Sequence, residues 1–472
     1  MPVQDHSDIS LGESDETTVP PPVRDEDDTF LPGFLETVRD AIAIEDRAGL
    51  AETLEPLEEA DVGELVNLLT PSEATQLVVL LGERFDFTVL TEVDDTVRER
   101  ILADLPAEAV AEGVRDIDSD DAVYILEDLD DEDQEAILAR LPEFERLKLE
   151  RSLDYPEDSA GRLMQTEFIA VPPFWTVGQT IDYMRVSDDL PNSFYELFVV
   201  DPTYHLLGIV PLDTLLRTRR PVRIEDIMAP SYHDVAATDD QEDVAREFDR
   251  YNLVSAAVLD ENERLVGCIM IDDVVDVIQE EAEEDIRRLS GVGDEEISDS
   301  VIYTTRSRFL WLVINLCTAV LASAVIGLFD ATIEQMVALA VLMPIVASMG
   351  GNAGTQTMTV AVRGLATREL GVYNAGRIVT RELLVGLLNG VLFAVIVSIV
   401  AIVWFQSFGL ALVIALAMIV NMICAGLAGI LIPLLLDRIG VDPAIASSVF
   451  LTTVTDVVGF FAFLGLAAAL LL

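Results

Sequence analysis

The sequence predicts a multidomain protein, in which an all-α N-terminal region and a mixed α/β region precede an all-α membrane region of five helices. The first observation is an abrupt change of charge near residue 300. Residues 301–472 contain seven acidic and seven basic side chains, whereas the first 300 residues contain 77 acidic and 22 basic ones. The N-terminal part therefore carries the whole net charge of −55. The other two observations are helical periodicity in the N-terminal region and an internal repeat in the region that follows it.

Long apolar runs after residue 300 predict the membrane helices. A spanning helix needs about 20 mainly apolar residues. Residues 383–436 form a run of 54 residues without a charge, which suffices for two helices joined by a turn at Gln406-Ser407-Phe408-Gly409. A large buried soluble core is the alternative, but soluble helices usually carry a charged face that these runs lack. The predicted spans before and after the double run are Phe309–Phe329, Gln335–Val362 and Pro443–Leu472.

The arginines predict the orientation, because cytoplasmic flanks of spanning helices are enriched in Lys and Arg. All seven arginines of the membrane region lie before the first predicted span, between the second and third, or between the fourth and fifth. The opposite loops, Asp330–Glu334 and Gln406–Gly409, contain none. We therefore expect a multi-pass protein of the cell membrane with its N-terminal region in the cytoplasm and its C-terminus outside. Met1–Thr29 is acidic and has no apolar stretch typical of a signal peptide.

Composition excludes several classes of function. The excess of acids argues against nucleic-acid binding, which needs basic patches. The single lysine, Lys148, lies in no glycine-rich phosphate loop. Cysteines and histidines form no metal-binding spacing, and no nucleophile and base pair indicates an enzyme. Such acidity suits a cytoplasm of very high salt, as in a halophile, and solvated acidic faces are then the ordinary explanation of an acidic cluster.

The N-terminal region is predicted to be helical from about Phe30. Apolar residues recur at helical spacing, and Leu-Pro or Thr-Pro pairs precede acidic residues. We expect an α-superhelix of short packed helices. The residues before it, with three consecutive prolines, are predicted to be a disordered acidic tail.

An internal repeat follows the helical region. Phe198–Asp213 aligns without gaps with Ala257–Asp272, and both copies read as strand, turn, strand and helix. The segments Met164-Gln165-Thr166 and Met228-Ala229-Pro230 open the two units. This arrangement resembles a tandem pair of cystathionine-β-synthase-type (CBS) domains, which form regulatory modules and in some families bind adenine nucleotides. Nothing else in the sequence supports a bound nucleotide here.

Further motifs follow one another along the chain: Ser159–Met164, Asp272–Asp276, Arg308 with Trp311 and Asn315, Pro344 with the stretch MGGNAGTQT at residues 349–357, Arg381-Glu382, Asp442-Pro443-Ala444 and Thr452–Asp456. With these elements in order, nearly the whole chain from about Phe30 resembles the MgtE family of magnesium channels. Val449 departs from the family, which often has proline at this position of the fifth span. The predicted domains are 1–29 disordered acidic tail, 30–155 α-helical N-terminal domain, 156–225 and 226–279 CBS domains, 280–305 connecting helix that plugs the pore, and 306–472 transmembrane pore domain.

Two features of the membrane region predict an ion path on physical grounds. Polar, glycine-rich backbone at membrane depth survives where it packs closely or lines water. Gly350, Gly351 and Gly354 could serve a helix-packing face equally well, whereas Asn352 favours the ion path. Asp456 is the only ionisable residue of the fifth span, and a carboxylate at mid-bilayer costs roughly 2.5 to 3.5 kcal/mol. With no basic residue in a span core, a divalent cation or water has to compensate it.

The resemblance supplies the rest of the expected function. It implies a homodimer in the lipid bilayer that takes up Mg²⁺ passively and is closed when cytoplasmic Mg²⁺ binds between acidic residues of its domains. Tyr124 and Asn252 stand where the family has acids, so regulatory sites could be missing or weak. The alternatives are a channel for Co²⁺ or Mn²⁺ and a membrane-anchored CBS sensor of nucleotides or ions. The predicted metal ligands are Asp456, Asn352, Asp442, Asp273, Asp276, Glu281, Glu284, Asp285, Asp240, Glu242 and Asp120.

Overall fold

The structure is a computed structural model that describes residues 23–25, 29–127, 129–187, 190–191, 193–229, 232–292, 301–371 and 373–471. The chain divides into two compact units, Met1–Asp154 and Tyr155–Leu472. Most of the predicted acidic tail lies outside the described residues.

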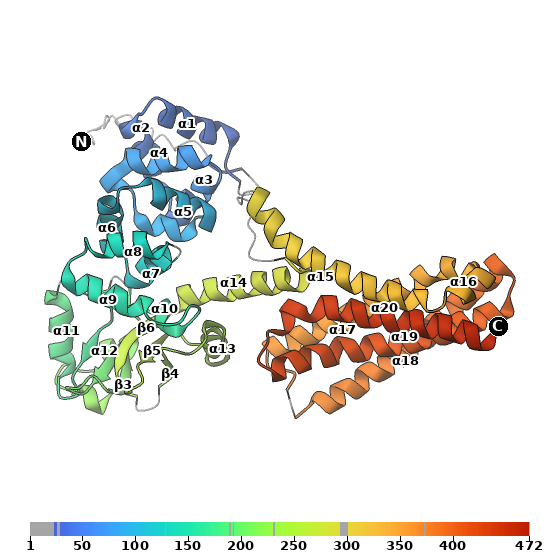
Figure 1. The fold of residues 1–472 in the computed structure, drawn as a ribbon. Helices are drawn as coiled ribbons and strands as arrows, with labels where there is room; N and C mark the ends of the chain where they lie inside the picture. Colours follow the sequence, from blue (N-terminus) through green and yellow to red (C-terminus); the bar gives the residue numbers. More distant parts are fainter. Residues whose placement is uncertain are drawn as a thin grey trace, which may run out of the picture. The chain divides into compact units, whose positions relative to one another are not determined.

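The first unit is all-α, as predicted, and its short helices follow one another along the unit (Figure 1). Helix starts use the residues that the sequence singles out. Pro71 is the first residue of its helix, and Thr70 and Glu73 form a reciprocal capping box before it. The helices are α1 (Pro32–Ala43), α2 (Arg47–Leu54), α3 (Glu59–Asn67), α4 (Pro71–Leu81), α5 (Asp95–Asp104), α6 (Ala107–Arg115), α7 (Ser119–Glu127), α8 (Asp131–Leu138) and α9 (Glu143–Leu153), with short 3₁₀ helices η1 (Gly82–Arg84) and η2 (Phe87–Glu92).

One continuous apolar core runs through these helices. Three stretches of the form Leu-x-x-Leu begin at Leu102, Leu126 and Leu138, and these three leucines are buried in the core. The stretches lie at helix ends, so each short helix contributes a few apolar residues to a shared core. A helix of this length is marginal alone and depends on such packing.

The mixed region contains two three-stranded sheets with the same strand order. In each sheet the first strand pairs parallel with the second, and the second pairs antiparallel with the third. Corresponding strands fall at matched positions of the sequence repeat, so the predicted CBS-type duplication is confirmed. The elements are α10 (Ala160–Leu163), β1 (Ala170–Val171), α11 (Val177–Val186), β2 (Glu196–Val200), β3 (Leu206–Pro211), α12 (Leu212–Arg217), η3 (Ile224–Asp226), β4 (Asp234–Ala236), α13 (Gln241–Tyr251), β5 (Ser255–Leu259), β6 (Leu265–Met270) and α14 (Ile271–Ser290).

Five helices of the described residues are long and apolar enough to cross a membrane. The first starts earlier than the predicted span, because Arg306 and Arg308 extend its polar end without breaking the helix. The loop after it contains a short helix that the sequence did not indicate. Gln406 ends the third span in a left-handed conformation and Ser407 caps the fourth, so the predicted turn is confirmed. These helices are α15 (Val301–Gly327), α16 (Asp330–Gln335), α17 (Ala338–Ala366), α18 (Ala375–Phe405), α19 (Phe408–Arg438) and α20 (Pro443–Leu470).

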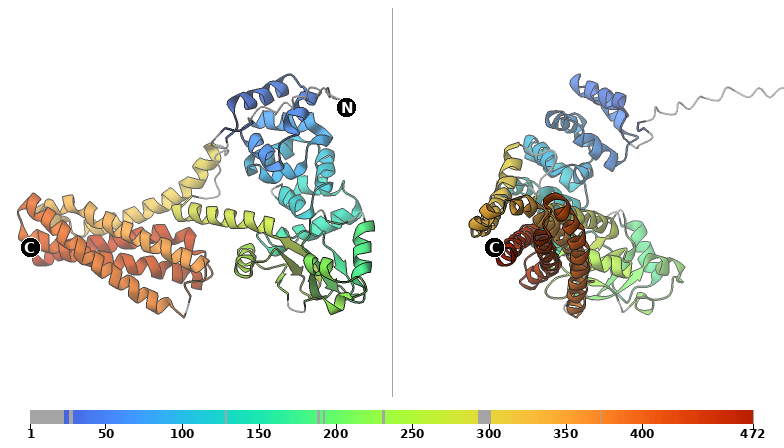
Figure 2. Two further views of the ribbon diagram at one scale, coloured as in Figure 1. Left: turned by 180° about the vertical axis from the view of Figure 1, so that it is seen from behind. Right: turned by 90° about the vertical axis from the view of Figure 1, so that its right-hand side faces the viewer.

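Helix α19 packs against α17, α18 and α20 and forms the centre of the membrane bundle (Figure 2). Glycines allow these contacts. A Cβ on Gly386 of α18 would lie 2.7 Å from the Met422 carbonyl oxygen of α19. A Cβ on Gly429 of α19 would lie 2.7 Å from the Gly354 carbonyl oxygen of α17. Without a hydrophobic driving force between helices in lipid, such close backbone contact supplies much of the association.

We therefore expect Gly386→Ala to lower the thermal stability of the detergent-solubilised protein, by about 1 to 3 kcal/mol of unfolding free energy, because the added methyl group overpacks the helix contact. Gly376→Ala is the matched control, since a Cβ on Gly376 in the first turns of α18 would meet no atom within 4 Å. Equal melting temperatures for the two variants would contradict the packing role.

Candidate functional site

The stretch MGGNAGTQT lies within α17 and is helical throughout. Its two faces differ. Gly350 and Gly354 are buried against the other helices: a Cβ on Gly354 would lie 2.8 Å from Leu451 of α20. Gly351 is different, because a Cβ there would meet no atom within 4 Å. The sequence left open whether the three glycines pack helices or line an ion path. Gly350 and Gly354 pack helices within the chain.

The opposite face of α17 is polar and exposed in the single chain. Asn352, Thr355, Gln356 and Thr359 are all exposed. The two threonine hydroxyls donate to carbonyl oxygens of their own helix, each over 3.0 Å. Polar amides facing lipid are unfavourable at membrane depth. This face therefore requires water or another protein surface beside it.

Asp456 lies in the middle of α20 and is half-buried. Among the described residues it forms no ion pair, in line with the absence of basic residues from the span cores. Counted at 1.5 Å per residue, Asp456 lies about 20 Å from the start of α20 and Asn352 about 21 Å from the end of α17. These two helix ends lie on the same side of the bundle (Figure 1). Gly354 of α17 lies against Leu451 of α20, so the two predicted pore residues are at a similar depth.

Glu382 is a second acidic residue of the membrane helices with a notable contact. The Thr357 hydroxyl of α17 donates a hydrogen bond of 3.2 Å to Glu382 of α18. Sequence reasoning placed Glu382 before the third span, but α18 begins at Ala375, so this residue lies two turns inside the helix. Its position directly before an apolar run was the available signal that it could belong to the helix.

Asp442, predicted as a metal ligand, makes two hydrogen bonds within the protein. One carboxylate oxygen accepts from the Ala444 amide over 2.7 Å and caps the start of α20. The other accepts from Arg288 of α14 over 2.5 Å. Arg288 also pairs with Glu284, another predicted ligand. A guanidinium thus occupies the space between the two acids.

Four other predicted ligands interact electrostatically around the start of α13 and the middle of α14. Burial raises the pKa of Glu242, and the neighbouring carboxylates of Glu281, Asp240 and Asp285 raise it further, against an opposing effect of Arg246. Burial also raises the pKa of Asp285, together with the charges of Asp442 and Glu281. Negative charge is therefore unfavourable here, which is the condition that a bound cation or proton relieves.

Three further predicted ligands have other local surroundings. Asp273 is in the first turn of α14, where it accepts from the Met270 amide, and Asp276 is on an exposed part of the same helix. Asp120 is in α7 of the first unit, where its carboxylate accepts from the Asp121 amide. Within the described part of the chain, no three His, Cys, Asp or Glu side chains are arranged to hold a metal ion.

The two departures from the acidic pattern have structural explanations. The guanidinium carbon of Arg98 lies over the Tyr124 ring, 4.4 Å from the centre of the ring. Arg98 is only 1 % exposed. An aromatic face stabilises such a buried cation. Asn252 ends α13 in the left-handed conformation, with φ of 54°. Asparagine tolerates that conformation better than other residues with a Cβ, apart from aspartate.

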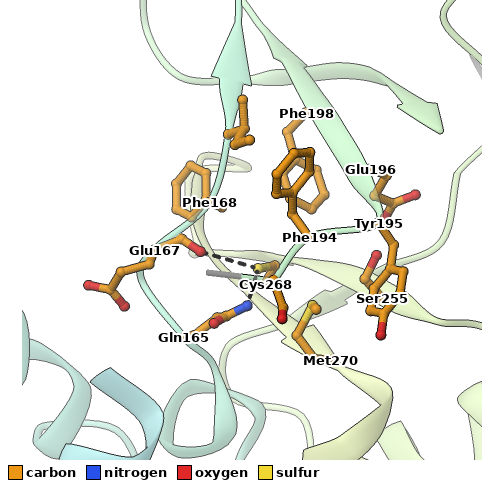
Figure 3. A pocket seen from close by; sticks show the side chains of 12 residues that line it. Gln165, Glu167, Phe168, Phe194, Tyr195, Glu196, Phe198, Ser255, Cys268 and Met270 are labelled. Atoms are coloured by element: carbon orange, nitrogen blue, oxygen red, sulfur yellow. Dashed lines mark hydrogen bonds between the residues drawn. The ribbon is translucent and has the colours of Figure 1, made fainter. Parts of the chain in front are cut away.

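A pocket lies between the two CBS repeats (Figure 3). Glu196 and Ser255, which occupy equivalent positions of the two repeats, both line it, and Cys268 lies near Gln165 at its base. Burial raises the pKa of Glu196. None of the lining residues is basic, so the lining itself offers no cation for a phosphate group.

Comparison with known proteins identifies the family. The family model MgtE, described as a divalent cation transporter, matches residues 343–466. The MgtE intracellular N domain matches residues 57–158, and the CBS domain matches residues 160–220 and 224–280. The magnesium transporter MgtE of Thermus thermophilus is 34 % identical over 330 residues, which cover 69 % of this chain and 73 % of that protein. The chain belongs to the MgtE family of magnesium transporters.

The chain is also similar to other proteins described as MgtE. The magnesium transporter MgtE of Enterococcus faecalis is 33 % identical and covers 68 % of this chain and 71 % of its own length. That of Bacillus subtilis is 29 % identical over 86 % of this chain and 87 % of its own. A solved structure described as the cytosolic domain of the Mg²⁺ channel MgtE in complex with ATP is 28 % identical, with a TM-score of 0.47 over 52 % of this chain and 99 % of that one.

The raised pKa values in this MgtE chain predict how its stability depends on pH. A carboxyl group with a raised pKa in the folded state takes up a proton at higher pH than in the unfolded state, so folding gains stability as the pH falls through the folded pKa. Without Mg²⁺, we expect Glu242→Gln and Asp285→Asn to raise the melting temperature at pH 8 and to flatten its rise as the pH is lowered towards the range where carboxyl groups titrate.

Asp201 provides a control of opposite sign. Hydrogen bonds from Thr203 and His205 lower its pKa to about 2. The stability that this lowered pKa gives to the folded state is present above the ordinary pKa of an aspartate, and it is lost as the pH falls towards about 2. Asp201→Asn should therefore lower the melting temperature at pH 8. A fall in all three variants would show that the raised pKa values do not govern stability.

Proposed function

We propose that this MgtE-family protein is a homodimeric, Mg²⁺-selective channel that takes up magnesium passively and is closed by Mg²⁺ bound to its cytoplasmic acids. The observation that supports it most is the position of Asp456 and Asn352 at a common depth of the membrane bundle, beside the exposed polar face of α17. A simple membrane anchor needs neither an uncompensated carboxylate nor a polar helix face at that depth. On the arginine distribution given above, the acidic region before the first span lies in the cytoplasm and the C-terminus lies outside.

A second copy of the chain explains the exposed polar face. If the α17 helices of two protomers face each other, Asn352 and its polar neighbours line a path shared by both chains. Two copies of Asp456 then lie at one level of that path. Their mutual repulsion is relieved by a divalent cation.

Magnesium fits such a path better than calcium. Mg²⁺ gives up its octahedral water shell reluctantly and is usually bound with several waters retained. Two carboxylates, amide oxygens and backbone carbonyls can hold the hydrated ion through its waters. A dehydrated Ca²⁺ ion needs six to eight oxygen ligands, and α20 offers one carboxylate per chain.

The acids around α14 are the proposed regulatory element. Glu242, Glu281 and Asp285 interact unfavourably without a cation. Regulatory Mg²⁺ shared among them and with Asp240 would remove that repulsion and favour the closed state. Asp442 and Glu284 are paired with Arg288, so Mg²⁺ has to compete with a guanidinium at those two ligands. Asp273, Asp276 and Asp120 complete the proposed set of regulatory ligands.

Asp456→Ala should reduce Mg²⁺ flux into proteoliposomes by about tenfold or more, because it removes the charge that balances the cation at mid-membrane. Asp456→Asn keeps an oxygen but loses the charge and should behave similarly. The measurement is divalent-ion uptake by the purified protein, with Co²⁺ and Mn²⁺ tested in parallel to separate the alternative ion specificities.

Asp330→Asn is the matched control, since it removes an acid from the outer helix α16. Wild-type Mg²⁺ flux in both Asp456 variants would remove Asp456 from the pore. A wild-type protein that carries no divalent ion at all would leave the membrane-anchored sensor as the better function.

Replacing Asp273, Asp276, Glu281 and Glu284 together by alanine should leave the channel open at a cytoplasmic Mg²⁺ concentration that closes the wild-type protein. The test belongs in molar KCl, where the Debye length is about 3 Å and general charge repulsion is screened. Screening by K⁺ cannot supply the directed ligation of a divalent ion. Mg²⁺-dependent closure is measured as flux against Mg²⁺ on the cytoplasmic side.

A control with the same loss of charge replaces Glu36, Asp40, Glu52 and Glu55 of the first unit, none of which is a predicted ligand. Closure by KCl alone, or normal closure of the first quadruple variant, would assign these acids to surface solvation and place the sensor elsewhere.

A further inference from the structure

Asn421, in the middle of α19, is a fully buried amide within the membrane bundle, at 0 % exposure. Its Nδ2 donates a hydrogen bond of 2.8 Å to the Val346 carbonyl oxygen of α17. A carbonyl can only accept, so this bond fixes which end of the amide faces α17. The Oδ1 atom is buried and has no hydrogen-bond partner among the described residues. Sequence reasoning did not single out this residue.

Two glycines enclose the Asn421 amide, one on each neighbouring helix. A Cβ on Gly350 of α17 would overlap the amide nitrogen. A Cβ on Gly459 of α20 would lie 2.9 Å from Nδ2 and 3.1 Å from Oδ1. The planar amide of α19 thus fills a narrow space between the backbones of α17 and α20, and neither glycine can carry a side chain without displacing it.

The three residues lie at one level of the bundle. At 1.5 Å per residue, Gly350, Gly459 and Asn421 are each about 24 to 26 Å from the ends of their helices on the same side of the bundle. Asn352 follows Gly350 by two residues, and Asp456 precedes Gly459 by three. The contact therefore joins the two helices within one turn of both proposed pore residues.

We infer that Asn421 is a positioning residue of the ion path, which holds α17 and α20 in the register that places Asn352 and Asp456 at a common depth. The inference rests on the proposed channel function. Asn421 itself does not touch the ion, because its side chain is closed off by the two glycine backbones. Its effect is exerted through the distance and register of the helices that carry the pore residues.

An amide achieves this in a way that an apolar side chain does not. Contacts between apolar side chains and a helix are similar at neighbouring positions, so they allow sliding along the helix axis. A hydrogen bond to one carbonyl selects a single register, and in the low dielectric of the membrane interior it is stronger than in water. The Gly350 and Gly459 contacts restrict the separation of the helices, and the bond to Val346 restricts their shift.

The test compares ion selectivity with stability in proteoliposomes. Asn421→Ala should change the ratio of Mg²⁺ to Co²⁺ flux by about threefold or more, the factor that corresponds to an average interhelical hydrogen bond in a membrane. Leu410→Ala is the control for loss of packing alone. Leu410 is buried on the same helix, at 1 % exposure, about 16 Å from Asn421 along the axis. It should lower the melting temperature and leave the flux ratio unchanged.

A double-mutant cycle tests the contact itself. Gly350→Ala should lower flux and melting temperature in the wild-type background, whereas Gly351→Ala, whose Cβ would meet no atom within 4 Å, should change little. In the Asn421→Ala background the space is free, so Gly350→Ala should have much less effect. Such non-additivity is expected only for residues that touch.

The outcomes separate the inference from the function on which it rests. Wild-type Mg²⁺ flux together with an unchanged flux ratio in Asn421→Ala, or additive effects in the cycle, would overturn the positioning role and leave the channel standing. A shift in the ratio for Leu410→Ala as large as that for Asn421→Ala would also overturn it. Absence of divalent flux in the wild-type protein would overturn both proposals.

Discussion

An uncompensated carboxylate at mid-membrane depth sets the requirements for the rest of the membrane region. Asp456 has no basic partner among the described residues, and lipid cannot solvate its charge. The side of the bundle near it must therefore be wet or occupied by a cation. The polar face of α17 at the same depth meets the same requirement, and its glycines let α19 and α20 pack on the other side. Helix α17 thus has one face packed against other helices and one polar face.

The part of the second unit that precedes the membrane helices is under a different constraint, the repulsion among its own acids. The 77 acids of the first 300 residues outnumber the bases there by 55. Because bases are few, each arginine that contacts an acid removes a large part of the repulsion around it. Two such ion pairs and one hydrogen bond from an arginine to a backbone carbonyl lie at the junction with the membrane helices. Arg288 pairs with Asp442, Arg368 pairs with Asp243, and Arg246 donates to the Ala366 carbonyl over 3.0 Å. These contacts hold the junction without metal, and Mg²⁺ at Asp442 would have to compete with one of them, the pair with Arg288.

Much of the fold could be predicted because its signals are local or repeated. Uncharged runs indicated the membrane helices, and the internal repeat indicated both sheets. The roles of individual acids could not be predicted in this way. Arg288 and Asp442 are 154 residues apart, and no periodicity relates them. Asn421 is one amide in a long uncharged run, so only its contacts with Val346, Gly350 and Gly459 distinguish it from a tolerated polar residue. Tyr124 and Asn252 looked like lost ligands, whereas contact with Arg98 and a left-handed backbone explain them.

Helix α14 starts directly at the end of strand β6 and continues without a break to Ser290, where Arg287 and Arg288 precede the left-handed Gly291. It acts as a stiff lever of about 30 Å between a sheet and the first turn of α20. A tilt of 10° at the sheet would move its far end by roughly 5 Å, about one helical turn. A rearrangement of a few tenths of that distance would already break the bond between Arg288 and Asp442. Small changes in how the two sheets pair would therefore reach the first turn of α20 as larger displacements, because α14 is long.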